Sequence, residues 1–190
     1  MLEVEVKYRA PNPAAVRARL LALGARRAWE ADEADHYFNG PDRDYRQTDE
    51  AFRIRRTAED TRLTYKGPKR EAATKTRKEV EVTVGDGRAE TATEMSELLV
   101  CLGFRPVAVV RKKRVAYHLD RPVGGKPRAV EVCFDEVEKV GSFVEVELVA
   151  EESEFEEAKA AVLGLAAELG LTDQERRSYL GLLLEATGQA

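Results

Sequence analysis

The chain is poor in the residue types that build most redox and zinc sites. Its 190 residues include two cysteines, two histidines and one tryptophan. Cys101 and Cys133 are too few for a disulfide framework, and we expect both to be reduced in a cytoplasmic protein. With only His36 and His118 available, a zinc site built on histidines is not expected.

Long apolar runs and glycine-rich phosphate loops are also missing. No stretch approaches the ~18–20 apolar residues of a membrane-spanning helix, and the start, MLEVEVK, does not read as a signal peptide. Neither GxxxxGK[ST] nor GxGxxG after a strand occurs. Lys and Arg total 31 against 35 for Asp and Glu, a net charge of −4. We therefore expect neither a nucleic acid nor a membrane as partner.

Charge, in contrast, is abundant. Charged residues make up 35% of the chain and hydrophobic residues 43%, against ~25% charged in a typical globular protein. The length suits one domain spanning residues 1–190, large enough to bury its own core. The surplus charge must therefore have a defined place in that domain.

Alternation of apolar and polar residues predicts eight strands, and capping signals predict four helices between and after them. The strands are expected near 2–9, 34–38, 51–57, 62–67, 78–84, 107–119, 128–135 and 143–149. The helices are expected near 13–23, 92–102, 154–169 and 173–186. This order predicts an α+β fold with a strongly curved or closed antiparallel sheet.

Local signals set the expected helix ends. Asn12 and Pro13 read as the N-cap and first position of the first helix, and Gly24 ends it. Three S/T-x-x-E capping boxes open the other helices: Thr91 with Glu94, Ser153 with Glu156, and Thr172 with Glu175. The segment 68–77 is polar and has no periodicity, which predicts a basic loop.

Acids and bases gather on one face of strand after strand. In the first strand, Leu2, Val4, Val6 and Tyr8 oppose Glu3, Glu5, Lys7 and Arg9. One strand of this kind is typical of a half-buried sheet with its charged face in water. Repeated over the set, and with at least three amphipathic helices to place, the pattern favours an eight-stranded closed barrel with helices outside and a polar lumen.

The lumen contents predict a ligand. Two ExE pairs, Glu3 with Glu5 and Glu145 with Glu147, offer all-oxygen coordination, which favours Mg²⁺ or Mn²⁺ over zinc. The basic residues of the same faces suit a chain of phosphates. They are Lys7, Arg53, Arg55, Lys66, Lys112 and Arg114.

An ordered set of motifs resembles the CYTH proteins, the triphosphate tunnel metalloenzymes. The set comprises EVEVK at 3–7 (family ExExK), DHYF at 35–38, FRIR at 52–55, LTYKGP at 63–68, KKRVAY at 112–117, DEV at 135–137 with GSFVEVE at 141–147, and SYLGLL at 178–183. The last resembles the tail of the class IV adenylate cyclase branch. Phe52 replaces a usual Leu, and Asn39 stands where an Asp often follows.

The resemblance implies an eight-stranded antiparallel tunnel that binds a triphosphate with Mg²⁺ or Mn²⁺. It implies metal-side roles for Glu3, Glu5, Glu145, Glu147 and Asp135. It implies phosphate-binding roles for Lys7, Arg53, Arg55, Lys66, Arg77, Lys112 and Arg114, and catalytic roles for Lys7, Arg55, Lys66, Lys112 and Arg114. The roles of Glu79 and Glu81 stay open, and a homodimer is implied by the cyclase resemblance alone.

Three functions fit these expectations. The first is a class IV adenylate cyclase-like enzyme that converts ATP to 3′,5′-cyclic AMP and pyrophosphate. The second is a triphosphatase acting on inorganic triphosphate, thiamine triphosphate or nucleoside triphosphates. The third is a non-catalytic module that binds polyphosphate or nucleotide, although binding alone would not require both metal-ligand pairs.

Other polar or aromatic residues allow a functional and a structural interpretation. Tyr37 could orient an attacking water, but a packed tyrosine is favoured. For His118 we favour a solvated or structural role, and for Cys133 a small filler over a nucleophile. Trp29 is interpreted as core or a packing edge. The basic run 111–114 alternates between two faces, which argues against a nucleic-acid patch.

Overall fold

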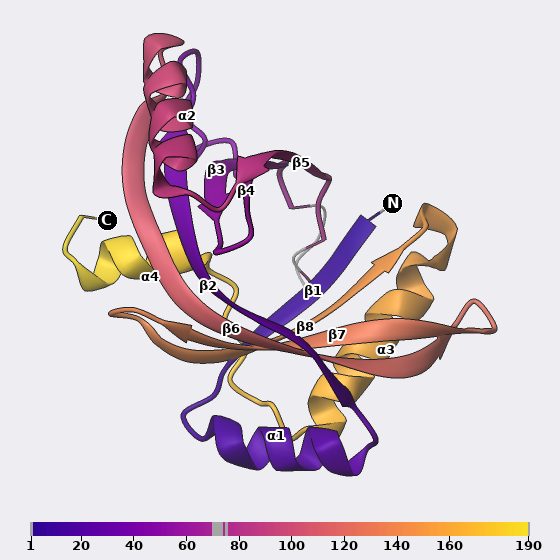
Figure 1. Cartoon of the computed structure of the whole chain (residues 1–190). Helices are drawn as coiled ribbons and strands as arrows, with labels where there is room; N and C mark the ends of the chain where they lie inside the picture. The colour runs from indigo at the N-terminus through magenta and orange to yellow at the C-terminus, as the bar shows by residue number, and fades with distance from the viewer. Residues whose placement is uncertain (1, 70–73, 75, 190) are drawn as a thin grey trace.

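The computed structural model describes residues 2–69, 74 and 76–189, so part of the predicted loop 68–77 lies outside the described residues. One eight-stranded antiparallel sheet carries four α-helices (Figure 1). In chain order the elements are β1 (Leu2–Arg9), α1 (Pro13–Ala22), β2 (Arg26–Asn39), β3 (Ala51–Arg56), β4 (Asp60–Lys66), β5 (Glu79–Asp86), α2 (Ala89–Cys101), β6 (Arg105–Val123), β7 (Lys126–Val137), β8 (Gly141–Ala150), the 3₁₀-helix η1 (Glu152–Glu154), α3 (Phe155–Glu168) and α4 (Tyr179–Ala186). No helix in this part of the chain is long and apolar enough to cross a membrane.

All eight predicted strands are present, but β2 is much longer than expected. It begins at Arg26 rather than at residue 34, and it pairs with β6 along nearly its whole length. The first five residues of β2 are exposed, so no apolar alternation marks them. Trp29 lies in this extension with 38% of its surface exposed, so of its two interpretations the core is wrong and the packing edge remains.

The first helix follows its sequence signals. The Asn12 side-chain oxygen accepts a hydrogen bond from the backbone N–H of Ala15 at 3.3 Å, and Pro13 occupies the first helical turn. Gly24 follows the helix with φ of +88°, a left-handed conformation that glycine adopts at little cost.

The capping boxes predicted for the second and third helices are wrong. α2 begins at Ala89, and the Thr91 hydroxyl donates to Asp86 at 2.9 Å in the preceding turn instead of capping. Ahead of α3 the capping box joins Glu151 and Glu154 around η1. In both places a carboxylate, which accepts more hydrogen bonds than a hydroxyl, holds the turn.

The fourth helix is shorter than the predicted 173–186. α4 begins at Tyr179, and the Ser178 hydroxyl caps it by accepting from the Gly181 N–H at 3.0 Å. Residues 173–175 are extended instead, because they hydrogen-bond to the free edge of β1. The Glu175 N–H donates to the carbonyl of Lys7 and the Arg9 N–H donates to the carbonyl of Asp173, both at 2.8 Å.

The sheet is open rather than a closed barrel, so the expected closure is not confirmed. Its strand order is β1-β8-β7-β6-β2-β3-β4-β5. Across the opening, the described residues of the two edges share one isolated bridge, between Glu3 and Arg77. Residues 173–175 already occupy the edge of β1 at its other end. No ladder can therefore form between β1 and β5 there.

The predicted division between an apolar outer face and a polar inner face is confirmed. Val4, Val6 and Tyr8 of β1 point into the largest core, which α1 and α3 cover; in Figure 1, α1 lies below the sheet and α3 crosses behind it. Two smaller cores lie under α2 and α4. On β5 the apolar face is uncovered, with Val80 and Val82 exposed at 46% and 54%.

Candidate functional site

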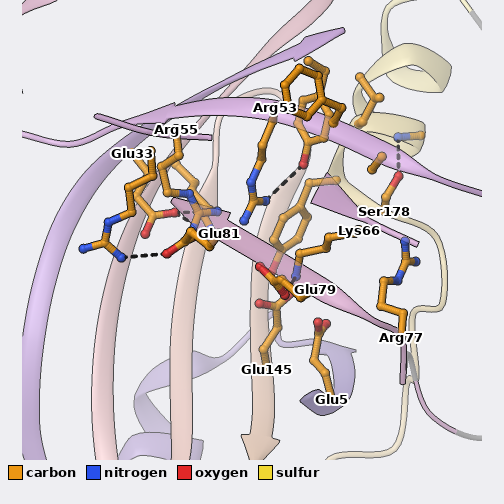
Figure 2. A pocket seen from close by; sticks show the side chains of 18 of the residues that line it. Glu5, Glu33, Arg53, Arg55, Lys66, Arg77, Glu79, Glu81, Glu145 and Ser178 are labelled. Atoms are coloured by element: carbon orange, nitrogen blue, oxygen red, sulfur yellow. Dashed lines mark hydrogen bonds and ion pairs between the residues drawn. The ribbon is translucent and has the colours of Figure 1, made fainter. Parts of the chain in front are cut away.

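The inner face of the curved sheet lines a cavity of about 1080 Å³. Every residue expected in the site lines it except Asp135; Figure 2 shows several of them pointing toward one another. The lining members are Glu3, Glu5, Lys7, Arg53, Arg55, Lys66, Arg77, Lys112, Arg114, Glu145 and Glu147. One cavity thus joins side chains from β1, β3, β4, β6 and β8.

Three of the predicted metal ligands form a carboxylate cluster. Oxygens of Glu3, Glu5 and Glu147 lie within 4.8 Å of one another, and Glu5 stands directly opposite Glu147 in the β1–β8 ladder. Burial, followed by the charge of Glu3, raises the pKa of Glu147 well above its usual range. Buried carboxylates this close repel one another unless a cation joins them. Their oxygens fit a hard divalent ion such as Mg²⁺ or Mn²⁺.

The other two predicted metal-side residues are engaged by Arg114. Glu145 faces the cavity and forms an ion pair with the Arg114 guanidinium. Asp135 lies beneath the cavity with its side chain fully buried. Its carboxylate accepts from Arg114 Nε at 2.7 Å and from the Tyr179 hydroxyl at 2.7 Å, and Lys112 Nζ lies 3.5 Å away. Asp135 therefore holds two basic side chains rather than reaching the carboxylate cluster.

Two further buried acids, which sequence reasoning did not assign to the site, hold its cationic wall. Asp35 accepts from Arg53 at 3.1 Å and from Arg55 at 2.7 Å. Glu33 pairs with Arg55 at 3.0 Å and with Lys112 at 3.1 Å. Both acids share the cavity-facing parity of β2, which is the signal that could have found them.

The same two acids stay ionised despite their burial. Burial alone would raise the pKa of Asp35, but Arg53 and Arg55 hold it well below its usual range. Likewise, burial opposes ionisation of Glu33, and Lys112 followed by Arg55 brings its pKa down to about 2. The guanidinium groups are thus oriented before any ligand arrives.

Lys66 spans the opening between the two edges of the sheet. Its Nζ lies 2.7 Å from Glu79 and 3.3 Å from Glu3. Burial lowers the pKa of Lys66, but the charges of these two carboxylates more than compensate and keep the amine protonated. Glu79, whose role was open, is therefore part of an ion-pair network, and Arg77 lies beside it at the bridge to Glu3.

Lys7 is held by the C-terminal segment. Its Nζ donates to the carbonyl of Arg177 at 2.6 Å and lies 3.9 Å from the centre of the Tyr179 ring. Tyr37 packs in the core beneath α4, and its hydroxyl accepts from Arg53 at 3.3 Å. These contacts favour the packed interpretation of Tyr37.

Comparison with known proteins agrees with this geometry. The family model described as the CYTH domain matches residues 1–179. The chain belongs to the CYTH family. CYTH proteins bind triphosphate substrates and depend on a metal, which accounts for carboxylates and cationic side chains meeting in one cavity.

Several relatives resemble the chain over nearly its full length. The PH1819 protein of Pyrococcus horikoshii is 37% identical with a TM-score of 0.81, covering 96% of this chain and 98% of that one. A Methanocaldococcus jannaschii protein named "Putative adenylate cyclase" is 34% identical over 185 residues, which is 96% of this chain and 98% of its own. A Hippeastrum protein described as having a dominant triphosphatase activity is 19% identical with a TM-score of 0.65, covering 99% and 97%; this likeness shows the fold alone.

One hydrogen-bond donor at the CYTH cavity has no acceptor among the described residues. The Nε of Arg53 is buried and has no hydrogen-bond acceptor within the described residues. A buried guanidinium N–H without an acceptor is costly. An anionic oxygen entering the cavity would satisfy it, which fits a phosphate chain at this wall.

Proposed function

We propose that this CYTH protein is a divalent-metal-dependent enzyme that converts ATP to 3′,5′-cyclic AMP and pyrophosphate. One observation carries the proposal: a single cavity joins the carboxylate cluster of Glu3, Glu5 and Glu147 to guanidinium groups held by buried acids. The choice of a cyclase is supported by the name of the M. jannaschii relative, at 34% identity.

The basic residues of the cavity have two different roles toward a bound triphosphate. Arg53, Arg55 and Lys112 orient phosphate oxygens, while Lys66 and Arg114 face the carboxylate cluster and stabilise charge that develops in the transition state. Glu3, Glu5 and Glu147 would hold the Mg²⁺ or Mn²⁺, which would neutralise phosphate charge and lower the pKa of an attacking hydroxyl. The ribose 3′-oxygen then forms a bond to the α-phosphorus as the bond to the β-phosphate oxygen breaks, which releases pyrophosphate and one proton.

Space beside the cationic wall favours a nucleotide. The cavity continues to the apolar side chains of Phe52, Val107, Leu180 and Leu184, the last two on α4. Its volume of about 1080 Å³ is slightly above the ~300–1,000 Å³ that ligand sites usually occupy. A base can stack there on apolar surface, which inorganic triphosphate would leave unused.

Triphosphate hydrolysis is the second candidate, because the Hippeastrum protein of the same fold is described as a dominant triphosphatase. In that reaction water would attack the terminal phosphorus in the same cavity. The two reactions differ in which phosphorus lies next to the activated nucleophile.

The product formed from ATP tests the proposal. We expect purified protein with Mn²⁺ to release cyclic AMP and pyrophosphate in equal amounts, measured by chromatography of products from ATP labelled at the α-phosphorus for cyclic AMP and at the γ-phosphorus for pyrophosphate and orthophosphate. Orthophosphate from ATP or inorganic triphosphate, without cyclic AMP, would make the protein a triphosphatase. Binding of either compound without any product would make it a binding module.

Replacing Arg53 tests the cationic wall. Arg53→Met is expected to weaken inorganic triphosphate binding about 10- to 100-fold, since a hydrogen bond to a charged group contributes ~1.5–3 kcal/mol. The loss should be larger at low salt, where charges are least screened. Calorimetric titration measures it, with Lys113→Met as the matched control, because Lys113 is exposed on β6 between two cavity residues. Equal affinity of the two variants would remove Arg53 from the site.

A further inference from the structure

A second group of metal-binding side chains lies next to the carboxylate cluster. Donor atoms of Glu131, Cys133 and Glu147 lie within 4.8 Å of one another. The Nε2 atom of His118 is 2.8 Å from a carboxylate oxygen of Glu131. These side chains come from β6, β7 and β8. A thiol and two carboxylates therefore converge on the inner face, and the imidazole of His118 contacts one of the carboxylates.

The sheet register builds this group. His118 stands directly opposite Glu131 in the β6–β7 ladder, and Glu131 stands directly opposite Glu147 in the β7–β8 ladder. Directly opposed residues have Cβ atoms ~4.5–5.5 Å apart. Cys133 follows Glu131 on the same face, two residues along β7. The three donors and the imidazole beside Glu131 are thus placed by three adjacent strands and by no flexible loop.

No lysine or arginine among the described residues forms an ion pair with Glu131 or Glu147. Glu131 accepts hydrogen bonds from Trp29 Nε1 at 3.1 Å and from the Cys133 thiol at 3.4 Å. Glu147 has no hydrogen bond or ion pair within the described part of the chain, although burial raises its pKa well above the usual range. Like charges opposed across a ladder destabilise a sheet. A cation bound between Glu131 and Glu147 would relieve this.

We propose that these residues form a site for a soft divalent transition-metal ion, of the class of Zn²⁺ or Co²⁺, with Cys133 Sγ, Glu131 and Glu147 as ligands and His118 as the residue that orients Glu131. A thiolate ligand favours such ions over Mg²⁺ and Mn²⁺, and three protein ligands leave the fourth tetrahedral position to water. Binding releases the thiol proton to water. The side chain of His118 is 43% exposed, which leaves a path for the ion.

The new site and the carboxylate cluster share Glu147. An ion held by Cys133 and Glu131 draws on the same carboxylate that Glu3 and Glu5 need to hold Mg²⁺ or Mn²⁺. Binding of the soft ion should therefore weaken binding of Mg²⁺ or Mn²⁺. This consequence, unlike the site itself, rests on the proposed function. Coupling of this kind is reciprocal, so Mn²⁺ should also weaken binding of the soft ion.

Titration with Co²⁺ tests the site without any assay of activity. We expect the near-ultraviolet thiolate-to-Co²⁺ charge-transfer band in the wild-type protein and its loss in Cys133→Ser. Cys101→Ser is the matched control, because Cys101 is exposed on α2 and should leave the band unchanged. His118→Gln keeps the thiol and should weaken Co²⁺ binding at least about tenfold. No band in the wild type, or a band that survives in Cys133→Ser, would overturn the site.

Inhibition provides the second readout. Zn²⁺ should inhibit Mn²⁺-supported turnover of the wild-type protein, and His118→Gln should require about tenfold more Zn²⁺ for the same effect. Equal inhibition of the two would overturn the coupling through Glu147 while the Co²⁺ band still reports the site. If the wild type has no turnover, the proposed function fails, and displacement of Co²⁺ by Mn²⁺, followed by the same band, tests the coupling instead.

Discussion

Glu147→Gln should abolish turnover, with a loss of about 10²–10³-fold or more, the range seen when one electrostatic contact to a transition state is removed. The same change should leave the thermal unfolding midpoint of the metal-free protein unchanged or raise it. Burial and the charges of Glu3 and Glu5 already disfavour the ionised form of Glu147. In the metal-free protein, the amide of Glu147→Gln therefore relieves the repulsion among the carboxylates. In the metal-bound protein, the same change removes one ligand of the ion.

Thermal shifts with Mn²⁺ separate these effects. A ligand that binds only the folded state raises the unfolding temperature, so wild type should gain stability from Mn²⁺ and Glu147→Gln should gain much less. Glu136→Gln is the matched control. Glu136 is exposed on β7, the strand next to β8, and lies on the face of the sheet opposite to the cavity. A wild-type Mn²⁺ shift together with wild-type turnover in Glu147→Gln would contradict the assignment of the carboxylate cluster.

Asp135→Asn is expected to have the largest effect on stability. Removing one partner of a buried ion pair costs ~3–5 kcal/mol, because the remaining charge is left uncompensated. Asp135 serves Arg114 and Lys112 together and also accepts from the Tyr179 hydroxyl. The amide keeps the shape of the side chain but cannot neutralise either base, so urea denaturation should show most of this loss.

Metal affinity decides between the two roles considered for Asp135. If Asp135 positions Arg114, Asp135→Asn should bind Mn²⁺ with nearly wild-type affinity under conditions where it is folded. Asp32→Asn, an exposed change on β2, controls for an amide elsewhere and should be neutral in both measurements. Weakened Mn²⁺ binding with stability intact would instead restore the metal-side role that the sequence suggested.

Period-two alternation was enough to predict the strands and the face on which the site lies. It placed Glu3, Glu5 and Lys7 on the inner face and Val4 and Val6 on the outer one, as the structure shows. It did not reveal the first half of β2, where exposed residues carry no alternation. It also did not reveal that the sheet stays open, because closure depends on what occupies the edge of β1.

The ion pairs within the site were harder to predict than the list of residues that line it. The sequence offered Asp135 and Glu145 as equivalent to Glu147, but both pair with Arg114. Which acid meets which base depends on the register between strands, and that is set by contacts far apart in the chain. The same limit hid the meeting of Cys133 and Glu131 on β7 with Glu147 on β8.

The pairing of β1 has a consequence for synthesis of the chain. β1 is made first, yet its ladder partner is β8, and Lys7 finds its hydrogen-bond acceptor 170 residues later at Arg177. The emerging strand must therefore wait, unpaired, until nearly the whole chain has left the ribosome. Its alternating acids and bases would keep such a strand from self-association in the meantime. The charges that line the finished cavity thus also protect the nascent protein from aggregation.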